Sequence, residues 1–129
     1  MTTNWPFLFS GVYGVFLGVL ILSWHVAPAV MRRFVADSYS LGTHGQVWAN
    51  WHAMGCLFVG AVNLMVVAGR FNDPDARHIA VASLAIYGVW CLQNLQLVLA
   101  RPRQFKPLMW LNVIACAIAA SGSAFVLVG

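Results

Sequence analysis

Charged side chains occur in only three short segments of this chain, and this distribution restricts the fold more than any other feature. The ten charged residues are Arg32, Arg33 and Asp37 in the first segment, Arg70, Asp73, Asp75 and Arg77 in the second, and Arg101, Arg103 and Lys106 in the third. Uncharged stretches lie between and beside them: Phe7–Met31, Gln46–Gly69, His78–Ala100 and Pro107–Val128. Each stretch exceeds the roughly 20 residues that an α-helix needs to cross a bilayer. The sequence therefore predicts an all-α integral membrane protein, a bundle of four transmembrane helices.

Composition agrees with a membrane protein and argues against a soluble domain. Hydrophobic residues make up 61% and charged residues 8% of the 129 residues. A soluble domain of this size could not bury so much apolar surface, whereas lipid solvates it and helices satisfy their own backbone groups. The chain is expected to form one transmembrane domain over residues 1–129. Its first stretch is expected to be retained rather than cleaved as a signal peptide, because it is too long for a secretory hydrophobic region and has no basic segment before it.

The loop charges predict an orientation in the membrane. The first and third loops together hold five Lys and Arg residues, and the second loop holds two. The positive-inside rule then places loops one and three in the cytoplasm and both termini outside, with a bacterial inner membrane as the expected location. The basic loops suit contact with anionic lipid head groups, and nothing in the sequence resembles a nucleic-acid-binding module.

The helix boundaries are predicted from proline, glycine and capping residues. The first helix is expected to begin after Trp5-Pro6, and Pro28 falls near its end, where a kink or frayed exit is tolerable. The later helices are expected over Gln46–Gly69, Ala76–Ala100 and Pro107–Val128, with Asp73 or Asp75 as the cap of the third helix. The long first loop, Arg32–Gly45, is expected to fold back as a lid or to form a short interfacial helix.

Small residues predict close helix contacts. Gly11, Gly14 and Gly18 form a stripe on the first helix, and the fourth helix is rich in alanine, glycine and serine. Such stripes let neighbouring helices approach closely, inside a bundle or between protomers, so a homo-oligomer is expected. Cys56, Cys91 and Cys116 fall within predicted spans without a CxxC pair. We expect them to be small core residues, with neither a disulfide nor a zinc site.

Polar residues gather near the ends of the helices that border loops one and three. The predicted group comprises His25, His52, Gln93, Asn94, Gln96 and Asn112, with Trp24, Trp48, Trp51, Trp90 and Trp110 around it. Intramembrane polar groups are costly and tend to face a cavity or a partner, so this group predicts a pocket. The alternatives are hydrogen bonds between helices and, for the tryptophans, anchors at the membrane interface.

His52 is the strongest candidate ligand in this group. Trp48 lies one turn before it, and Asn63 lies eleven residues after it on nearly the same helix face. Neutral imidazole is a good ligand for iron, and a haem fits between the helices of a bundle. His52 alone, or His52 together with His25 as a bis-His pair, would bind haem; a histidine hydrogen-bonded to a neighbouring helix is the alternative. The predicted spans lack carboxylates, which argues against a di-iron site.

The segment Trp48-Ala49-Asn50-Trp51-His52-Ala53-Met54-Gly55 resembles the Trp-Ala-x-x-His segment that opens the second helix of styrene oxide isomerases. Trp24-His25 is similar to an aromatic-rich stretch with a histidine near the end of the family's first helix, and Gly88-Val89-Trp90 is similar to a Gly-Trp pair in its third. The resemblance covers helices one to three, about residues 7–102.

The resemblance implies a small four-helix membrane enzyme that works as a trimer with haem b. In that family the ferric iron acts as a Lewis acid on an epoxide oxygen and drives rearrangement to an aldehyde, and the axial ligand corresponds to His52. The chain departs from the family in several respects: it lacks the family's charged tails, its orientation from the positive-inside rule is inverted, and two residues differ. Phe58 or a neighbour stands where the family has an asparagine, and Leu95 or Gln96 stands where it has a tyrosine.

The sequence thus predicts a haem-b-dependent isomerase of a small apolar epoxide that arrives from the lipid bilayer. His52 would be the metal ligand, and Asn63, Gln93 or Asn94 would orient the substrate. The cofactor would also be contacted by His25 and by an apolar wall of Trp48, Trp51 and Trp90. Two other classes stay open: a bis-His electron-transfer subunit, and a cofactor-free accessory or lipid-binding membrane protein.

Overall fold

The computed structural model of the chain describes residues 4–36 and 42–129 and is all-α in architecture. Its elements are α1 (Trp5–Leu22), the 3-10 helix η1 (Ser23–His25), α2 (Pro28–Met31), α3 (Thr43–Val67), α4 (Asp73–Ala100) and α5 (Met109–Val128). Four segments are long and apolar enough to span a membrane: Trp5–His25, Thr43–Val67, Asp73–Ala100 and Met109–Val128. The predicted four-helix integral membrane bundle is confirmed.

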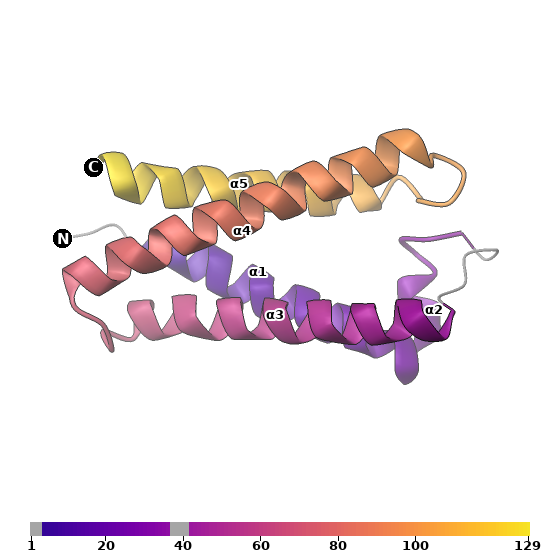
Figure 1. Cartoon of the computed structure of the whole chain (residues 1–129), viewed down its shortest axis with the longest axis horizontal. Coiled ribbons are helices and arrows are strands. Elements are labelled where there is room, and N and C mark those ends of the chain that lie inside the picture. Colours follow the sequence, from indigo (N-terminus) through magenta and orange to yellow (C-terminus); the bar gives the residue numbers. More distant parts are fainter. Residues whose placement is uncertain (1–3, 37–41) are drawn as a thin grey trace.

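The four long helices form two antiparallel hairpins. One hairpin pairs α1 with α3 and the other pairs α4 with α5 along most of their lengths, while α1 touches α5 and α3 touches α4 over shorter stretches. The hairpins lie close together at the end that holds the two termini and diverge toward the other end (Figure 1). This divergence separates the helix ends that carry the first and third loops.

Glycines explain how closely α1 and α3 approach. A Cβ added at Gly60 would lie 2.6 Å from the backbone nitrogen of Val15 and 2.8 Å from the carbonyl oxygen of Gly11. A Cβ at Gly14 would in turn lie 2.9 Å from Cα of Gly60. The predicted glycine stripe of the first helix is therefore a helix contact within the chain, with α3 as its partner.

The first membrane span is shorter than the uncharged stretch that predicted it. It ends at His25 rather than Met31, because α1 tightens into the 3-10 turn at Ser23 and the helix then breaks. The Ser23 hydroxyl donates to the carbonyl of Leu20 at 2.6 Å, and Ala27, which precedes Pro28, has φ −142° and ψ 64°. A proline disfavours helical geometry in the residue before it, so the chain leaves the helix before Pro28.

Local signals set the other helix ends. The carboxamide oxygen of Asn72, rather than Asp73 or Asp75, caps α4 by accepting from the backbone N–H of Asp75 at 2.9 Å. The two aspartates lie in the first turn, where their charge favours the positive end of the helix dipole. α3 ends at Val67 and is followed by a left-handed Gly69 with φ 67°. The N–H groups of Gly69 and Arg70 donate to the carbonyls of Val66 and Met65 at 3.0 Å.

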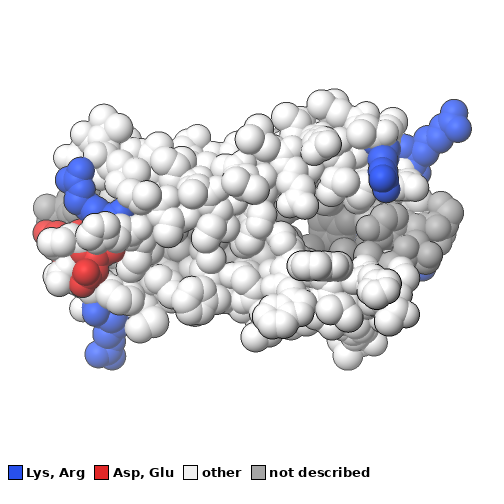
Figure 2. Space-filling model, viewed as in Figure 1, with Lys and Arg blue, Asp and Glu red and all other residues white. Residues whose placement is uncertain are grey.

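The buried core occupies the half of the bundle where the hairpins meet. One cluster of buried residues consists of Val59, Tyr87, Cys116 and Ala119, and a second consists of Phe7, Val66 and Ala80. Only 22% to 33% of each candidate span is buried inside the chain. The remaining apolar surface forms an uncharged belt between charged ends (Figure 2), which is the surface expected to face lipid.

Candidate functional site

A cavity of about 1060 Å³ lies between the diverging halves of the two hairpins. Figure 2 shows a hollow on one face of the molecule, between the two hairpins of Figure 1 and near the end where they diverge. The walls are mainly apolar, and their phenylalanine and tryptophan residues are Phe9, Phe16, Trp24, Phe34, Trp48, Trp51 and Phe105. Its polar lining residues are few: Tyr13, His52, Gln93, Asn94 and Asn112. A large apolar cavity with a few polar groups is the usual form of a small-molecule site.

The first and third loops join to close one end of the cavity. Val35 and Phe105 form an isolated antiparallel bridge, in which the N–H of Ala36 donates to Gln104 at 2.8 Å and the N–H of Lys106 donates to Phe34 at 2.7 Å. We call this pairing the loop bridge. Phe34, Val35 and Phe105 all line the cavity. At residues 34–36 the first loop forms this loop bridge, which is consistent with the predicted lid, and not the alternative of a short interfacial helix; residues 37–41 of that alternative lie outside the described residues.

The loop bridge is reinforced by its basic side chains. The ammonium group of Lys106 donates to the carbonyl of Arg32 at 2.5 Å, and the guanidinium of Arg32 donates to the carbonyl of Ala36 at 3.0 Å. The same guanidinium lies 5.5 Å from the ring centroid of Trp24, which is a cation–π distance. These contacts connect the end of the first span to the loop between α4 and α5.

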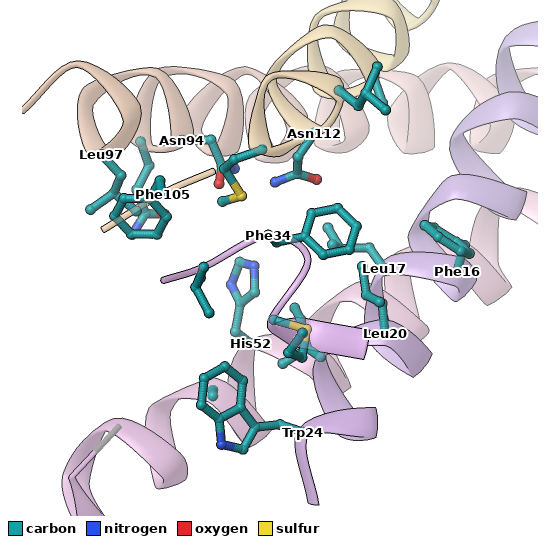
Figure 3. Close-up of a pocket in the computed structure, with 18 of the residues that line it drawn as sticks. Phe16, Leu17, Leu20, Trp24, Phe34, His52, Asn94, Leu97, Phe105 and Asn112 are labelled. Carbon is teal, nitrogen blue, oxygen red and sulfur yellow. The ribbon is translucent and has the colours of Figure 1, made fainter. Parts of the chain in front are cut away.

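His52 projects from α3 into the middle of the cavity. Its imidazole points toward the wall that carries Asn94 and Asn112 (Figure 3). The ring packs against the indole of Trp90, with centroids 4.8 Å apart and planes tilted by 60°. Among the described residues, neither ring nitrogen of His52 has a hydrogen-bond partner. The imidazole is therefore held by packing, and its nitrogens are available to a ligand.

The structure brings most of the predicted site residues together around His52. Trp48 and Trp51 line the cavity from α3 although their side chains are 74% and 71% exposed, so the cavity opens sideways along this helix. Gln93 and Asn94 line it from α4. Trp90 stands behind His52 and contacts its ring rather than the cavity.

Two predicted residues lie elsewhere. Asn63 is 1% exposed in the half where the hairpins meet, and its amide nitrogen donates to the hydroxyl of Ser83 on α4 at 2.9 Å. The exposed His25 is outside the cavity lining, and its Nε2 lies 2.7 Å from Oδ1 of Asn50. The expectations that Asn63 orients a ligand beside His52 and that His25 shares a cofactor with it do not match these positions.

Sequence reasoning missed Tyr13. This residue lies about 18 Å before His25 along a helix at 1.5 Å per residue, so depth counted from the helix ends places it in the opposite half of the bundle. The structure shows that the cavity extends inward to Tyr13, whose hydroxyl donates to the carboxamide oxygen of Asn112. The sulfur of Cys116 lies 3.3 Å from the same hydroxyl. No pattern in the sequence indicates how far the cavity extends.

Metal chelation by side-chain clusters finds no support in the described part of the chain. No group of three His, Cys, Asp or Glu side chains in residues 4–36 and 42–129 lies close enough to hold a metal ion. Cys56 and Cys116 are buried core residues, and Cys91 is half-buried against α5, where its sulfur contacts the carbonyl of Val113 at 3.6 Å. The burial of Cys56 and Cys116 agrees with the expected role of small core residues.

Fold and site together define a helical integral membrane protein with a cavity between its helices, into which His52 projects. No protein-family model, no curated protein and no solved structure matches the chain. The function is therefore argued from the cavity and its residues.

Proposed function

We propose that the cavity binds haem b through His52 and that the protein is a membrane isomerase that converts a small apolar epoxide into a carbonyl compound. The observation that carries this proposal is the placement of His52. Its imidazole projects into a cavity of about 1060 Å³, and its nitrogens have no hydrogen-bond partner among the described residues. The resemblance of the segment around His52 to styrene oxide isomerases adds the epoxide chemistry.

The residues around the cavity fit a haem group. His52 supplies the imidazole ligand, and the aromatic walls suit a flat apolar macrocycle. Basic side chains that would suit the two haem carboxylates occur in the first and third loops, which form the loop bridge: Arg32, Arg33, Arg101, Arg103 and Lys106. When bound there, haem iron supplies a Lewis acid that stabilises negative charge developing on a substrate oxygen.

The protein itself would contribute the shape of the cavity, the exclusion of water from it and the orientation of the substrate. Phe34 and Phe105 of the loop bridge close the end of the cavity that faces the aqueous loops, and Trp24 extends this apolar wall. Exclusion of water strengthens electrostatic stabilisation inside the site and protects an epoxide from hydrolysis. Carboxamide groups on the opposite wall hold the substrate by hydrogen bonds.

The position of His25 favours single-histidine ligation over the bis-His alternative. Its ring lies outside the cavity lining and forms a hydrogen bond with Asn50. His52 would thus be the one imidazole that the protein offers to the cofactor, and the carboxamide wall of the cavity would remain for a substrate. Electron transfer through a bis-His centre is therefore the less favoured function.

Substrate is proposed to enter from the bilayer. Val12 and Phe16 of α1 and Leu111 of α5 line the cavity and are more than half exposed, with exposed fractions of 56%, 57% and 58%. The seam between α1 and α5 thus opens toward lipid. An apolar epoxide dissolved in the membrane would reach the site through it without crossing the basic loops.

The proposed orientation places the loop bridge in the cytoplasm and both termini outside. Five of the seven basic residues lie at the end with the loop bridge, while the opposite end carries Arg70 and Arg77 beside Asp73 and Asp75 (Figure 2). This bias supports the positive-inside assignment, with a bacterial inner membrane as the location. Assembly as a homo-trimer follows from the resemblance alone.

A visible absorption spectrum of the detergent-purified protein, oxidised and then reduced with dithionite, tests the proposal. We expect a Soret band that His52→Ala abolishes and that the matched control His25→Ala retains. Loss of the band in both variants would favour bis-His ligation. A colourless, folded protein after haem is supplied during expression would refute haem binding and favour a cofactor-free lipid-binding function.

A second measurement separates haem binding from isomerase activity. The haem-loaded protein in nanodiscs is incubated with styrene oxide, and the product is analysed for phenylacetaldehyde. We expect rearrangement that requires His52. A haem-loaded protein that leaves the epoxide unchanged would refute the isomerase function while preserving the haem site.

A further inference from the structure

The inner end of the cavity carries a carboxamide whose orientation is fixed by a tyrosine. The hydroxyl of Tyr13 on α1 donates to Oδ1 of Asn112 on α5. The ring of Tyr13 packs against Phe9 and Tyr87, with centroid distances of 6.1 Å and 6.0 Å. The ring is therefore held on two sides, and its hydroxyl holds the oxygen of Asn112 on the side of α1.

This hydrogen bond determines which atoms of Asn112 a ligand can meet. A carboxamide has one accepting oxygen and one NH₂ group with two donors. Because the oxygen is engaged with Tyr13, the NH₂ group is directed toward the space between Asn94 and His52 (Figure 3). Neither of its N–H groups has a partner among the described residues. The cavity thus presents a fixed hydrogen-bond donor.

The other carboxamides of the cavity do not offer an equivalent donor. The Nδ2 of Asn94 donates one of its two N–H groups to the carbonyl of Trp90 at 2.7 Å, so this amide keeps at most one donor for a ligand. Gln93 is exposed, and its longer side chain is held by no hydrogen bond among the described residues. Asn112 is therefore the cavity amide whose donors are both free and oriented.

We propose that Asn112, oriented by Tyr13, is the site that binds the oxygen atom of the ligand. The ligand class is a compact apolar molecule with an acceptor oxygen, such as an epoxide, a cyclic ether or a ketone. Asn112 makes the contact and Tyr13 acts as a positioning residue. This inference deepens the proposed function, because it rests on the same cavity and names a specificity determinant within it.

Two isosteric, unreactive probes test the inference without any reaction. Isochroman carries an ether oxygen where tetralin carries a methylene group, so the ratio of their affinities isolates one acceptor. Binding to the full chain in nanodiscs is followed by quenching of tryptophan fluorescence, since Trp24, Trp48 and Trp51 line the cavity. Empty nanodiscs correct for partition into lipid. We expect wild type to prefer isochroman by about 3- to 10-fold, the range of one net hydrogen bond.

Four variants identify the residue responsible for the preference. Asn112→Leu and the double variant Tyr13→Phe/Asn112→Leu are expected to bind both probes equally. The double variant removes the Tyr13 hydroxyl together with its acceptor on Asn112. It is therefore expected to fold even if Asn112→Leu alone does not, because the hydroxyl is not left without that acceptor. Tyr13→Phe is expected to lower the preference by about 2-fold or more while tetralin affinity stays unchanged. Gln96→Leu removes an amide on α4 outside the cavity lining and is expected to keep the wild-type preference.

The outcomes separate this inference from the proposed function. An isochroman preference that survives in Asn112→Leu or in the double variant overturns the inference, even if the protein isomerises epoxides. Equal loss of affinity for both probes in these variants also overturns it, because the residues would then only shape the cavity. If the protein does not bind haem but its preference for isochroman depends on Asn112, this inference is supported and only the proposed haem chemistry is refuted.

Discussion

Replacement of Gly60 by alanine is the most direct test of how the two membrane hairpins are built. The added Cβ would lie 2.6 Å from the nitrogen of Val15, 2.8 Å from the oxygen of Gly11 and 3.0 Å from the carbonyl carbon of Gly14, all of which are backbone atoms. To regain an ordinary contact of 3.4 Å, α1 and α3 would have to separate locally by about 0.8 Å. No side-chain rotation can relieve these contacts, so the helices themselves must move.

We expect Gly60→Ala to lower the free energy of unfolding by about 1–3 kcal/mol through overpacking. Alanine also favours the helix by about 0.5–1 kcal/mol over glycine, which partly offsets this loss. The matched control is Gly55→Ala in the same helix, where an added Cβ meets nothing within 4 Å. The control gains the same helix propensity without the clash. The difference between the two variants therefore isolates the contact between α1 and α3.

The assay is an unfolding titration with SDS in mixed micelles, followed by far-UV circular dichroism. Gly55→Ala should unfold at the same or a higher SDS fraction than wild type, and Gly60→Ala at a lower one. Equal stabilities of the two variants, within about 0.5 kcal/mol, would refute the close backbone packing of α1 on α3.

Three further predictions concern buried polar contacts, the loop bridge and the orientation. In a double-mutant cycle, Asn63→Ala and Ser83→Ala should each destabilise the protein and show a coupling of about 0.6 kcal/mol, typical of hydrogen bonds inside membranes; zero coupling would contradict their contact. Lys106→Met should speed hydrogen exchange of the loop-bridge amides by about 10-fold, because one charged hydrogen bond is lost; unchanged exchange would show that the loop bridge holds without it. A membrane-impermeant maleimide should label Asp75→Cys in intact cells and Arg103→Cys only after permeabilisation, and the reverse pattern would invert the proposed orientation.

Much of the site could be anticipated from the sequence because helix ends and depth follow from chain position. Antiparallel helices place residues near their shared loop ends at similar depth. This rule correctly predicted that His52, Gln93, Asn94 and Asn112 lie together around one cavity. The same reasoning failed for Asn63. It shares a helix face with His52 but lies about 16 Å further along the axis at 1.5 Å per residue, where the hairpins are in contact.

The sequence alone determined the membrane spans and most of their ends. Lipid requires uninterrupted apolar helices, and Gly69 and Pro28 act on the chain locally, so their effects can be read without knowing the neighbours. The cap of α4 was predicted wrongly, at Asp73 or Asp75 instead of Asn72. Sequence also determined that charge would lie only at the two ends of the bundle, since ionic groups are costly in the membrane.

Only the tertiary structure decided which helices pair and where they separate. Gly14 and Gly60 join α1 to α3 by backbone contact, and this leaves α4 and α5 as the second hairpin. The angle between the hairpins opens the cavity, and it depends on packing across the whole bundle rather than on any segment. The orientation of Asn112 likewise depends on Tyr13, ninety-nine residues away in the chain. Contacts of this kind arise from three-dimensional packing, for which local sequence carries no signal.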